Sequence, residues 1–299
     1  MPEHVSRPQT VLCATDLSSR CDRAVDRAAL LAREWHARMV VVHALETTSE
    51  FLQSRRLHDL PTWQRPQDRA EAVAQQLRSD MVDAGADPTV VVETGEPAAV
   101  ILAQAERQKA DLIITGVARS ELFGRRLIGT TVDALIRRAD TPILLVRGRP
   151  RQPYRNIVVA SDFSPGSRQG LELAARLFAP APLTLFHAYS VPTGGALDTA
   201  RQAREGWRSL VRQDAQIFLD QSDLGSMYPR DVRLLLEEGD AGLLLRDYVG
   251  VAAVDLVVTG APSRGALMEM LLGSTAQRLV DGMPCDVLVA RSRADAGRR

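Results

Sequence analysis

The sequence predicts an α/β protein made of two tandem copies of one domain, each built on a parallel β-sheet that is flanked by helices. Three observations support this prediction: the chain length, a repeat that keeps its register, and short apolar segments that alternate with amphipathic ones. The chain has 299 residues, which corresponds to roughly two domains of about 150 residues each. We expect the first domain over residues 1–149 and the second over residues 150–299.

Five pairs of similar segments establish the repeat. Thr10–Ser18 reads TVLCATDLS and Asn156–Ser164 reads NIVVASDFS, at an offset of 146 residues. Four further pairs keep an offset of 144 residues: His43 and His187, Glu93–Glu96 and Glu237–Asp240, Ala110–Gly116 and Val254–Gly260, and Ile128–Thr131 and Leu272–Thr275. Such a constant register indicates a duplication. The polar stretch Arg147–Arg155 contains two prolines and is expected to link the copies.

Within each copy, apolar segments alternate with segments of helical periodicity. The first copy has expected strands at 11–14, 39–44, 89–92, 112–115 and 143–146, and Ser18 is expected to cap the first helix. The second copy has expected strands at 156–160, 183–189, 232–237, 256–259 and 286–290, with expected helices at 164–178, 199–221, 240–252 and 273–281. Nearly continuous apolar strands separated by helices indicate a buried parallel sheet.

The composition excludes several classes of protein. The chain has 37 acidic and 37 basic residues, so no net charge draws it to nucleic acid or to an anionic membrane. No apolar run reaches the ~20 residues needed to cross a bilayer. The three cysteines have no metal-ligand spacing, and their small number fits a reducing compartment. We therefore expect a cytoplasmic protein that binds neither nucleic acid nor membranes and holds no metal through its own cysteines.

Candidate ligand-binding residues lie where the expected strands end. The first strand of each copy ends at Asp16 or Asp162, and the fourth ends at Gly116 or Thr259-Gly260. Ligands of open α/β sheets bind at such strand ends, and a glycine there lets a ligand approach the backbone. Thirteen residues after each glycine, a Gly-Thr or Gly-Ser pair opens a helix, which suits a phosphate. The alternative is that each Asp caps the following helix and each Gly makes a turn.

These features resemble the universal stress protein family in its tandem two-domain form. The resemblance rests on the strand-one Asp, the His on strand two, the Asp-Leu-apolar-apolar-Thr-Gly segment and the late Gly-Ser/Thr helix start, and it covers nearly the whole chain. It implies that each domain is Rossmann-like (HUP-type), with five strands in the order 3-2-1-4-5. It also implies an adenine nucleotide ligand, ATP with or without Mg²⁺.

The ATP-binding members of that family carry Gly-x-x-Gly, nine further residues and then Gly-Ser/Thr. Both copies keep this spacing, but Arg119 and Ser263 replace the second glycine. Ser263 is small, and its N–H and hydroxyl can donate to phosphate. Arg119 is bulky and is expected to fill the phosphate region rather than to supply charge to it. The second copy is therefore expected to be the better nucleotide site.

The resemblance also assigns roles to individual residues. Asp162 and the backbone of Ala188 would hold the adenosine end, and the phosphates would lie at Thr259, Gly260, Ser263, Gly273, Ser274 and Thr275. The equivalent residues of the first copy are Asp16, Ala44, Gly116, Gly129, Thr130 and Thr131. His43 and His187 lie in apolar strands and are expected to be structural, so no catalytic residue is predicted. The segment 121–126 is expected to be a loop over the ligand.

The predicted function is stress-response binding or signalling through an adenine nucleotide. The resemblance further implies that the two copies pack as an internal pseudo-dimer and that two chains can pair again. Two alternatives remain open: a ligand-free dimeric interaction scaffold in which both sites have decayed, and a slow ATPase. The sequence has no complete Walker loop and no dinucleotide fingerprint, which disfavours an ATP-consuming synthetase or ligase.

Overall fold

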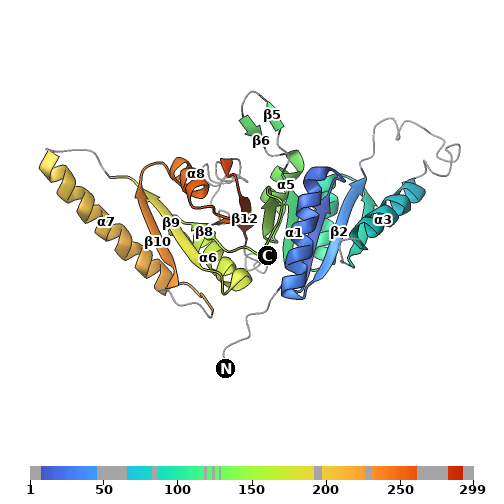
Figure 1. Cartoon of the computed structure of the whole chain (residues 1–299), viewed down its shortest axis with the longest axis horizontal. Helices are drawn as coiled ribbons and strands as arrows, with labels where there is room; N and C mark the ends of the chain where they lie inside the picture. Colours follow the sequence, from blue (N-terminus) through green and yellow to red (C-terminus); the bar gives the residue numbers. More distant parts are fainter. Residues whose placement is uncertain are drawn as a thin grey trace. The chain divides into compact units, whose positions relative to one another are not determined.

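The chain folds into two compact units that divide between Pro153 and Tyr154 in the computed structural model (Figure 1). We call them the N-terminal unit and the C-terminal unit. The structure describes residues 8–45, 66–82, 87–117, 120–122, 125–127, 129–191, 197–225, 231–260 and 282–291.

The N-terminal unit contains a five-stranded parallel sheet. Its strands are β1 (Thr10–Thr15), β2 (Arg38–Leu45), β3 (Thr89–Thr94), β4 (Leu112–Gly116) and β7 (Ile143–Val146), and they pair in the order β3-β2-β1-β4-β7. Its helices are α1 (Ser19–Trp35), α3 (Pro66–Val82), α4 (Pro97–Arg107) and α5 (Thr130–Arg138). Every residue of β1, β4 and β7 is buried, as expected for apolar strands covered on both faces.

The C-terminal unit repeats this arrangement. Its strands are β8 (Ile157–Ala160), β9 (Leu183–Tyr189), β10 (Arg233–Glu238), β11 (Leu256–Gly260) and β12 (Asp286–Ala290), in the order β10-β9-β8-β11-β12. Its helices are α6 (Pro165–Phe178), α7 (Leu197–Asp220) and α8 (Ala241–Val251). α6 packs on β8 and β11, and α8 packs on β9. The expected parallel α/β fold is thus confirmed, and both units have the order 3-2-1-4-5.

One expected loop is a hairpin. β5 (Ser120–Leu122) and β6 (Arg125–Leu127) pair antiparallel, with Ser120 opposite Leu127. The prediction of a segment without strands over 121–126 is therefore wrong. Strands of three residues are too short to give a period-two signal in the sequence. The helix expected at 273–281 lies outside the described residues.

The repeated motif that ends in Gly95-Glu96 and Gly239-Asp240 forms the same strand-to-helix turn in each unit. The backbone at Gly239 has φ of 141°, which favours glycine. The side chain of Glu96 then accepts hydrogen bonds from the N–H groups of Ala98 and Ala99, and Asp240 caps α8 in the same way. This part of the repeat is explained by helix capping.

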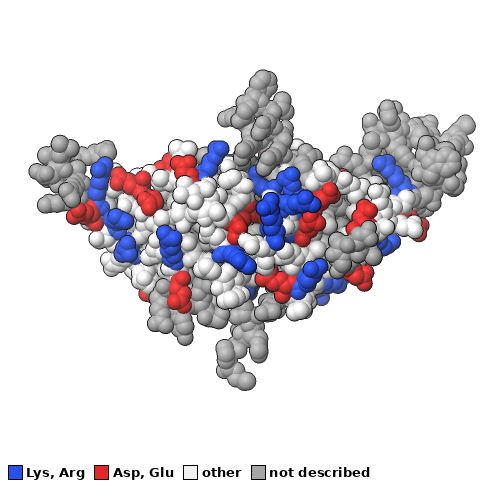
Figure 2. Space-filling model, in the orientation of Figure 1, with Lys and Arg blue, Asp and Glu red and all other residues white. Residues whose placement is uncertain are grey.

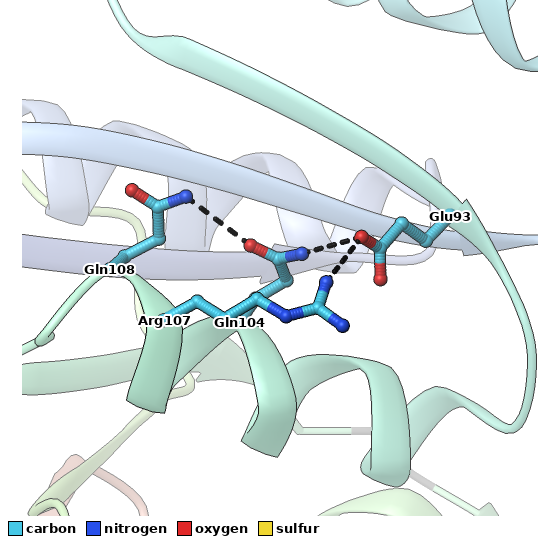
Figure 3. A network of polar contacts seen from close by, with 4 residues as sticks. All are labelled: Glu93, Gln104, Arg107 and Gln108. Carbon is cyan, nitrogen blue, oxygen red and sulfur yellow. Dashed lines mark hydrogen bonds and ion pairs between the residues drawn. The ribbon is translucent and has the colours of Figure 1, made fainter.

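A polar network on the N-terminal unit joins the end of β3 to α4 (Figure 3). The carboxylate of Glu93 accepts from the buried amide of Gln104 at 2.6 Å and from Arg107 at 2.8 Å, and Gln108 donates to Gln104 at 3.3 Å. The positions of Gln104, Arg107 and Gln108 are occupied in the C-terminal unit by Tyr248, Val251 and Ala252. Val251 is 89% exposed, so the two units present different surfaces at this helix.

The segment between the units is held from both sides. Arg23 and Arg27 of α1 each donate at 2.9 Å to a backbone carbonyl of this segment, those of Arg147 and Gln152. The hydroxyl of Tyr154 donates to the buried carboxylate of Asp286 at 2.6 Å, within the C-terminal unit. These bonds fasten the expected linker closely to each unit.

Acidic and basic side chains lie interspersed on the face seen in Figure 2. Among the described helices, none has the length and apolar character needed to cross a membrane.

Candidate functional site

The strand order reverses at β8, because β9 lies on one side of it and β11 on the other. Asp162 follows the carboxyl end of β8 and is exposed. Its carboxylate accepts a hydrogen bond from the N–H of Ser164 at 3.0 Å. In the N-terminal unit, Asp16 follows β1 and accepts from both the N–H and the hydroxyl of Ser18. Each aspartate therefore shapes its own loop and still presents an exposed carboxylate at the switch point.

The residue after each aspartate has a left-handed backbone. Phe163 has φ of 61° and Leu17 has φ of 62°. The N–H of Phe163 donates to the hydroxyl of Ser161 at 3.0 Å, and the N–H of Leu17 donates to Thr15 at 3.1 Å. A non-glycine residue persists in this region only where its surroundings fix it, and such residues gather at functional sites. Both units keep this strained turn.

Local contacts set the charge of Asp162. Partial desolvation of the carboxyl group by its neighbours has the largest single influence and would raise its pKa, but the hydrogen bonds from Ser164 and Ser167 together outweigh it and lower the pKa below the ordinary value. The carboxylate is therefore ionised at neutral pH and is an acceptor for hydroxyl or amino groups.

The serine cap differs between the units. Ser18 is the N-cap residue of α1, as expected, and its carbonyl accepts from the N–H groups of Cys21 and Asp22. Its hydroxyl, however, donates to Asp16 and makes no bond to the N–H groups of α1. The hydroxyl is directed toward the Asp16 carboxylate, which is a strong charged acceptor for its hydrogen. In the C-terminal unit, Ser164 does cap α6, because its hydroxyl accepts from the N–H of Ser167 at 3.3 Å.

Both strand-two histidines bind the backbone beside the aspartates. Nδ1 of His187 lies 2.8 Å from the carbonyl of Ser161, and Nδ1 of His43 lies 2.9 Å from the carbonyl of Thr15. A carbonyl only accepts, so Nδ1 carries the hydrogen in both residues. The ring of Phe163 stacks on His187 with centroids 4.1 Å apart. Each histidine thus holds the end of the neighbouring strand through one ring nitrogen.

The backbone of Ala188 faces the end of β8. The N–H of Ser161 donates to the carbonyl of Phe186 at 2.9 Å, so that carbonyl faces β8. Backbone groups two residues apart in a strand face the same side, so the N–H and C=O of Ala188 also point this way. By this level β8 has ended and the chain has turned into the Asp162 loop. In the N-terminal unit, β1 likewise ends at Thr15, opposite His43 and one residue short of Ala44.

Gly260 lies against the backbone of α6. A Cβ at this position would lie 2.1 Å from the backbone oxygen of Gly166 in the first turn of α6. The close approach of the α6 backbone therefore explains why this position is a glycine. Thr259 is buried, and its hydroxyl donates to the carbonyl of Gly260 at 3.4 Å. The side chain of Thr259 thus faces the protein.

Comparison with known proteins decides the family. The model described as "Universal stress protein family" matches the chain twice, at residues 8–147 and 153–291. The chain belongs to the universal stress protein family. The two matches follow one another along the chain, as the resemblance implies for the tandem form.

Individual universal stress proteins are similar to parts of the chain or to all of it. One from Thermus aquaticus, named for its place in a QAH/OAS sulfhydrylase 3'region, is 30% identical over 141 residues, which cover 46% of this chain and 98% of that protein. One from Mycobacterium tuberculosis strain H37Rv is 27% identical over 207 residues, 61% of this chain and 62% of that protein. A crystal structure of one from Archaeoglobus fulgidus has a TM-score of 0.67 at 18% identity, and covers 94% of this chain and 98% of that one. This last likeness shows the fold.

The residues that the family motif points to are only partly described. Ser263, Gly273, Ser274 and Thr275 lie in the segment 261–281, outside the described residues, as does Arg119. In the N-terminal unit, Gly116 ends β4 and is buried, and Gly129, Thr130 and Thr131 stand at the start of α5 as expected. The structure thus brings Asp16, Ala44 and Gly116 together at the carboxyl ends of the strands in the N-terminal sheet. Asp162, Ala188 and Gly260 lie at the corresponding strand ends in the C-terminal sheet.

The sequence does not reveal the contact between Ser161 and Ser167. Their hydroxyl oxygens lie 2.9 Å apart, and Ser167 is buried. The available signal is the spacing of Ser164 and Ser167, three residues apart at a helix start, which is typical of capping. In this universal stress protein, such contacts hold the loop that carries Asp162.

Proposed function

We propose that this protein is a stress-response protein that binds an adenine nucleotide, ATP. The site lies at the carboxyl ends of β8 and β9 in the C-terminal unit and is formed by Asp162 and Ala188. The observation that carries the proposal is the backbone of Ala188, which points past the end of β8 beside an ionised carboxylate. Adenine presents an acceptor, N1, next to a donor, the N6 amino group. One backbone N–H and C=O pair matches that order.

The carboxylate of Asp162 supports the sugar end of this proposal. Carboxylates at the ends of strands in dinucleotide-binding folds bond ribose hydroxyls, which are donors of the right kind. Because its pKa is lowered, Asp162 accepts such bonds without first losing a proton. The phosphates would lie toward Gly260 and the residues after it, where Ser263 replaces the motif glycine with a small hydroxyl side chain.

An equilibrium titration of the purified protein with ATP tests the proposal. Asp162→Asn keeps the size of the side chain and removes its charge, and Asp16→Asn makes the matched change in the N-terminal unit. We expect ATP to bind, Asp162→Asn to weaken binding about tenfold, and Asp16→Asn to change it little. The reverse ranking would move the site to the N-terminal unit, and no binding by the unaltered protein would refute the proposal.

One observation favours a second candidate, a ligand-free interaction scaffold. Both copies have lost the second glycine of the motif, to Arg119 and Ser263. In that case the protein acts in the cytoplasm through self-association alone. Analytical ultracentrifugation with and without ATP separates the two: a scaffold assembles identically in both conditions, and its melting temperature does not respond to ATP.

A further inference from the structure

A chain of hydroxyl groups fastens the Asp162 loop to the first turn of α6. Ser161 accepts from the N–H of Phe163 at 3.0 Å, and its hydroxyl oxygen lies 2.9 Å from that of Ser167. The hydroxyl of Ser167 donates to the carbonyl of Ser164 at 3.0 Å. The N–H of Ser167 donates to the hydroxyl of Ser164 at 3.3 Å. Ser167 thus bonds to residues on both sides of Asp162.

The number of hydrogens fixes the direction of this chain. A serine hydroxyl carries one hydrogen, and a carbonyl or carboxylate only accepts. Ser167 donates its hydroxyl hydrogen to the Ser164 carbonyl or to the Asp162 carboxylate. Its contact with Asp162 also lowers the pKa of that carboxyl group. In either case the hydroxyl of Ser161 must donate to Ser167. Neither hydroxyl has a second hydrogen to donate. Because Ser167 is 5% exposed, water does not readily take the place of its hydroxyl group.

The N-terminal unit lacks this connection. Thr15 and Cys21 occupy the positions of Ser161 and Ser167, at the offset of 146 residues. The hydroxyl of Thr15 accepts from the N–H of Leu17, as Ser161 does from Phe163. The structure describes both Thr15 and Cys21, and no hydrogen bond joins them. Burial, and then contact with Asp16, raises the pKa of the Cys21 thiol to about 11, so it stays neutral. A neutral thiol is a weak donor and a weak acceptor.

Side-chain packing differs in the same sense. Phe163 stacks on His187 and packs at 5.4 Å against the ring of Phe218 from α7. Leu17, its counterpart, is 46% exposed. The strained residue is therefore fixed by ring packing in one unit, while in the other its side chain is nearly half exposed.

We propose that Ser167 is the positioning residue of the C-terminal site: through Ser161 it fixes the loop 161–164 so that Asp162 is held ready for the ligand. Cys21 contacts Asp16 but makes no bond to Thr15, so the equivalent connection is missing from the N-terminal loop among the described residues. The part of this inference that concerns the nucleotide rests on the proposed function, whereas the part that concerns the loop does not. It follows that the loop of the C-terminal unit is the more rigid of the two and that its site is the tighter one.

Reciprocal substitutions in the full chain test the inference. Ser167→Cys makes the C-terminal loop like the N-terminal one, and Cys21→Ser makes the opposite change. The ligand-free readouts are hydrogen exchange at the amides of Phe163 and Leu17 and an NMR titration of the Asp162 carboxyl. We expect Ser167→Cys to speed exchange at Phe163 and to raise the pKa of Asp162. We expect Cys21→Ser to slow exchange at Leu17 about fivefold, the effect of one hydrogen bond.

Nucleotide binding supplies the second readout. Ser167→Cys should weaken ATP binding about fivefold in an Asp16→Asn background, and Cys21→Ser should strengthen it in an Asp162→Asn background. If Ser167→Cys leaves both the amide exchange and the Asp162 titration unchanged, the positioning role is refuted. If these readouts move but no ATP binds, the loop inference stands and the proposed ligand is wrong. If Ser167→Cys does not fold, the Cys21→Ser result alone decides: unchanged exchange at Leu17 refutes the inference.

Discussion

Nδ1 of His187 donates to the backbone carbonyl of Ser161 at 2.8 Å, and thereby ties the second strand of the C-terminal unit to the residue before its candidate aspartate. His43 and Thr15 keep the same contact at 2.9 Å in the other unit. We predict that His187→Phe, which removes the donor, destabilises the protein by about 1–3 kcal/mol, because the carbonyl loses a part-buried partner. Urea unfolding measures this. His187→Asn, which keeps a donor, should cost less, and equal losses would contradict the account.

Gly260 is required by the backbone of α6. A Cβ there would lie 2.1 Å from the oxygen of Gly166, and backbone atoms cannot move away cheaply. We predict that Gly260→Ala lowers the free energy of unfolding by about 1–3 kcal/mol, the usual cost of overpacking. Gly250→Ala is the matched control, since a Cβ at this helical position meets no atom within 4 Å, and should stabilise by up to about 1 kcal/mol. If both variants melt alike, the steric argument fails.

Most of the fold follows from the sequence, because the apolar segments that predict strands are the segments that the sheets bury. Val11 and Leu112 mark two of them, and both are fully buried. The hairpin at Ser120–Leu122 does not follow, because three residues carry too little pattern. The steric role of Gly260 does not follow either, because a sequence shows that a small residue is needed but not which backbone approaches it.

The candidate site follows only in part. Asp162 and Ala188 can be found from the repeat and the family motif. Ser167 cannot, because a serine near a helix start is ordinary in sequence and gains its meaning from the 2.9 Å contact with Ser161. The difference between Ser167 and Cys21 likewise becomes informative only once the contacts are known.

The lowered pKa of Asp162 predicts how stability depends on pH. A carboxyl whose pKa is lower in the folded chain contributes stability above its unfolded pKa of about 4, and this contribution is lost as the pH falls through the folded value. We therefore expect the stability difference between the unaltered protein and Asp162→Asn to be constant near neutral pH and to shrink below about pH 4. Urea unfolding across this range measures it. A difference that grows on acidification would contradict the direction of the shift.

The two arginines of α1 that hold the interdomain segment should protect it from proteolysis. Loss of the bonds from Arg23 and Arg27 frees the carbonyls of Arg147 and Gln152. We predict that the double variant Arg23→Ala/Arg27→Ala is cut by trypsin after Arg151 several-fold faster than the unaltered protein, because cleavage requires local opening. Mass mapping of the fragments locates the cut. Arg33→Ala, an exposed arginine of the same helix, is the control, and equal acceleration by it would remove the role of the two bonds.

The hydroxyl of Tyr154 should matter for the stability of the C-terminal unit. It donates to the buried carboxylate of Asp286 at 2.6 Å, and its ring packs edge-on against Phe178 at 5.4 Å. Tyr154→Phe keeps the ring and removes the hydrogen bond. We expect a loss of about 1.5–3 kcal/mol in the free energy of unfolding, the range for a bond to a charged group. A loss below about 0.5 kcal/mol in chemical denaturation would show that this bond does not anchor the start of the unit.

Mass spectrometry of the protein purified without added ligand tests the central claim most directly. Under native conditions we predict a mass that exceeds that of the polypeptide by one adenine nucleotide, which is released on denaturation and is recovered as ATP. Asp162→Asn should abolish or reduce this excess, and Asp16→Asn should preserve it. A native mass equal to that of the chain alone, and unchanged after ATP is added, would contradict nucleotide binding by this protein.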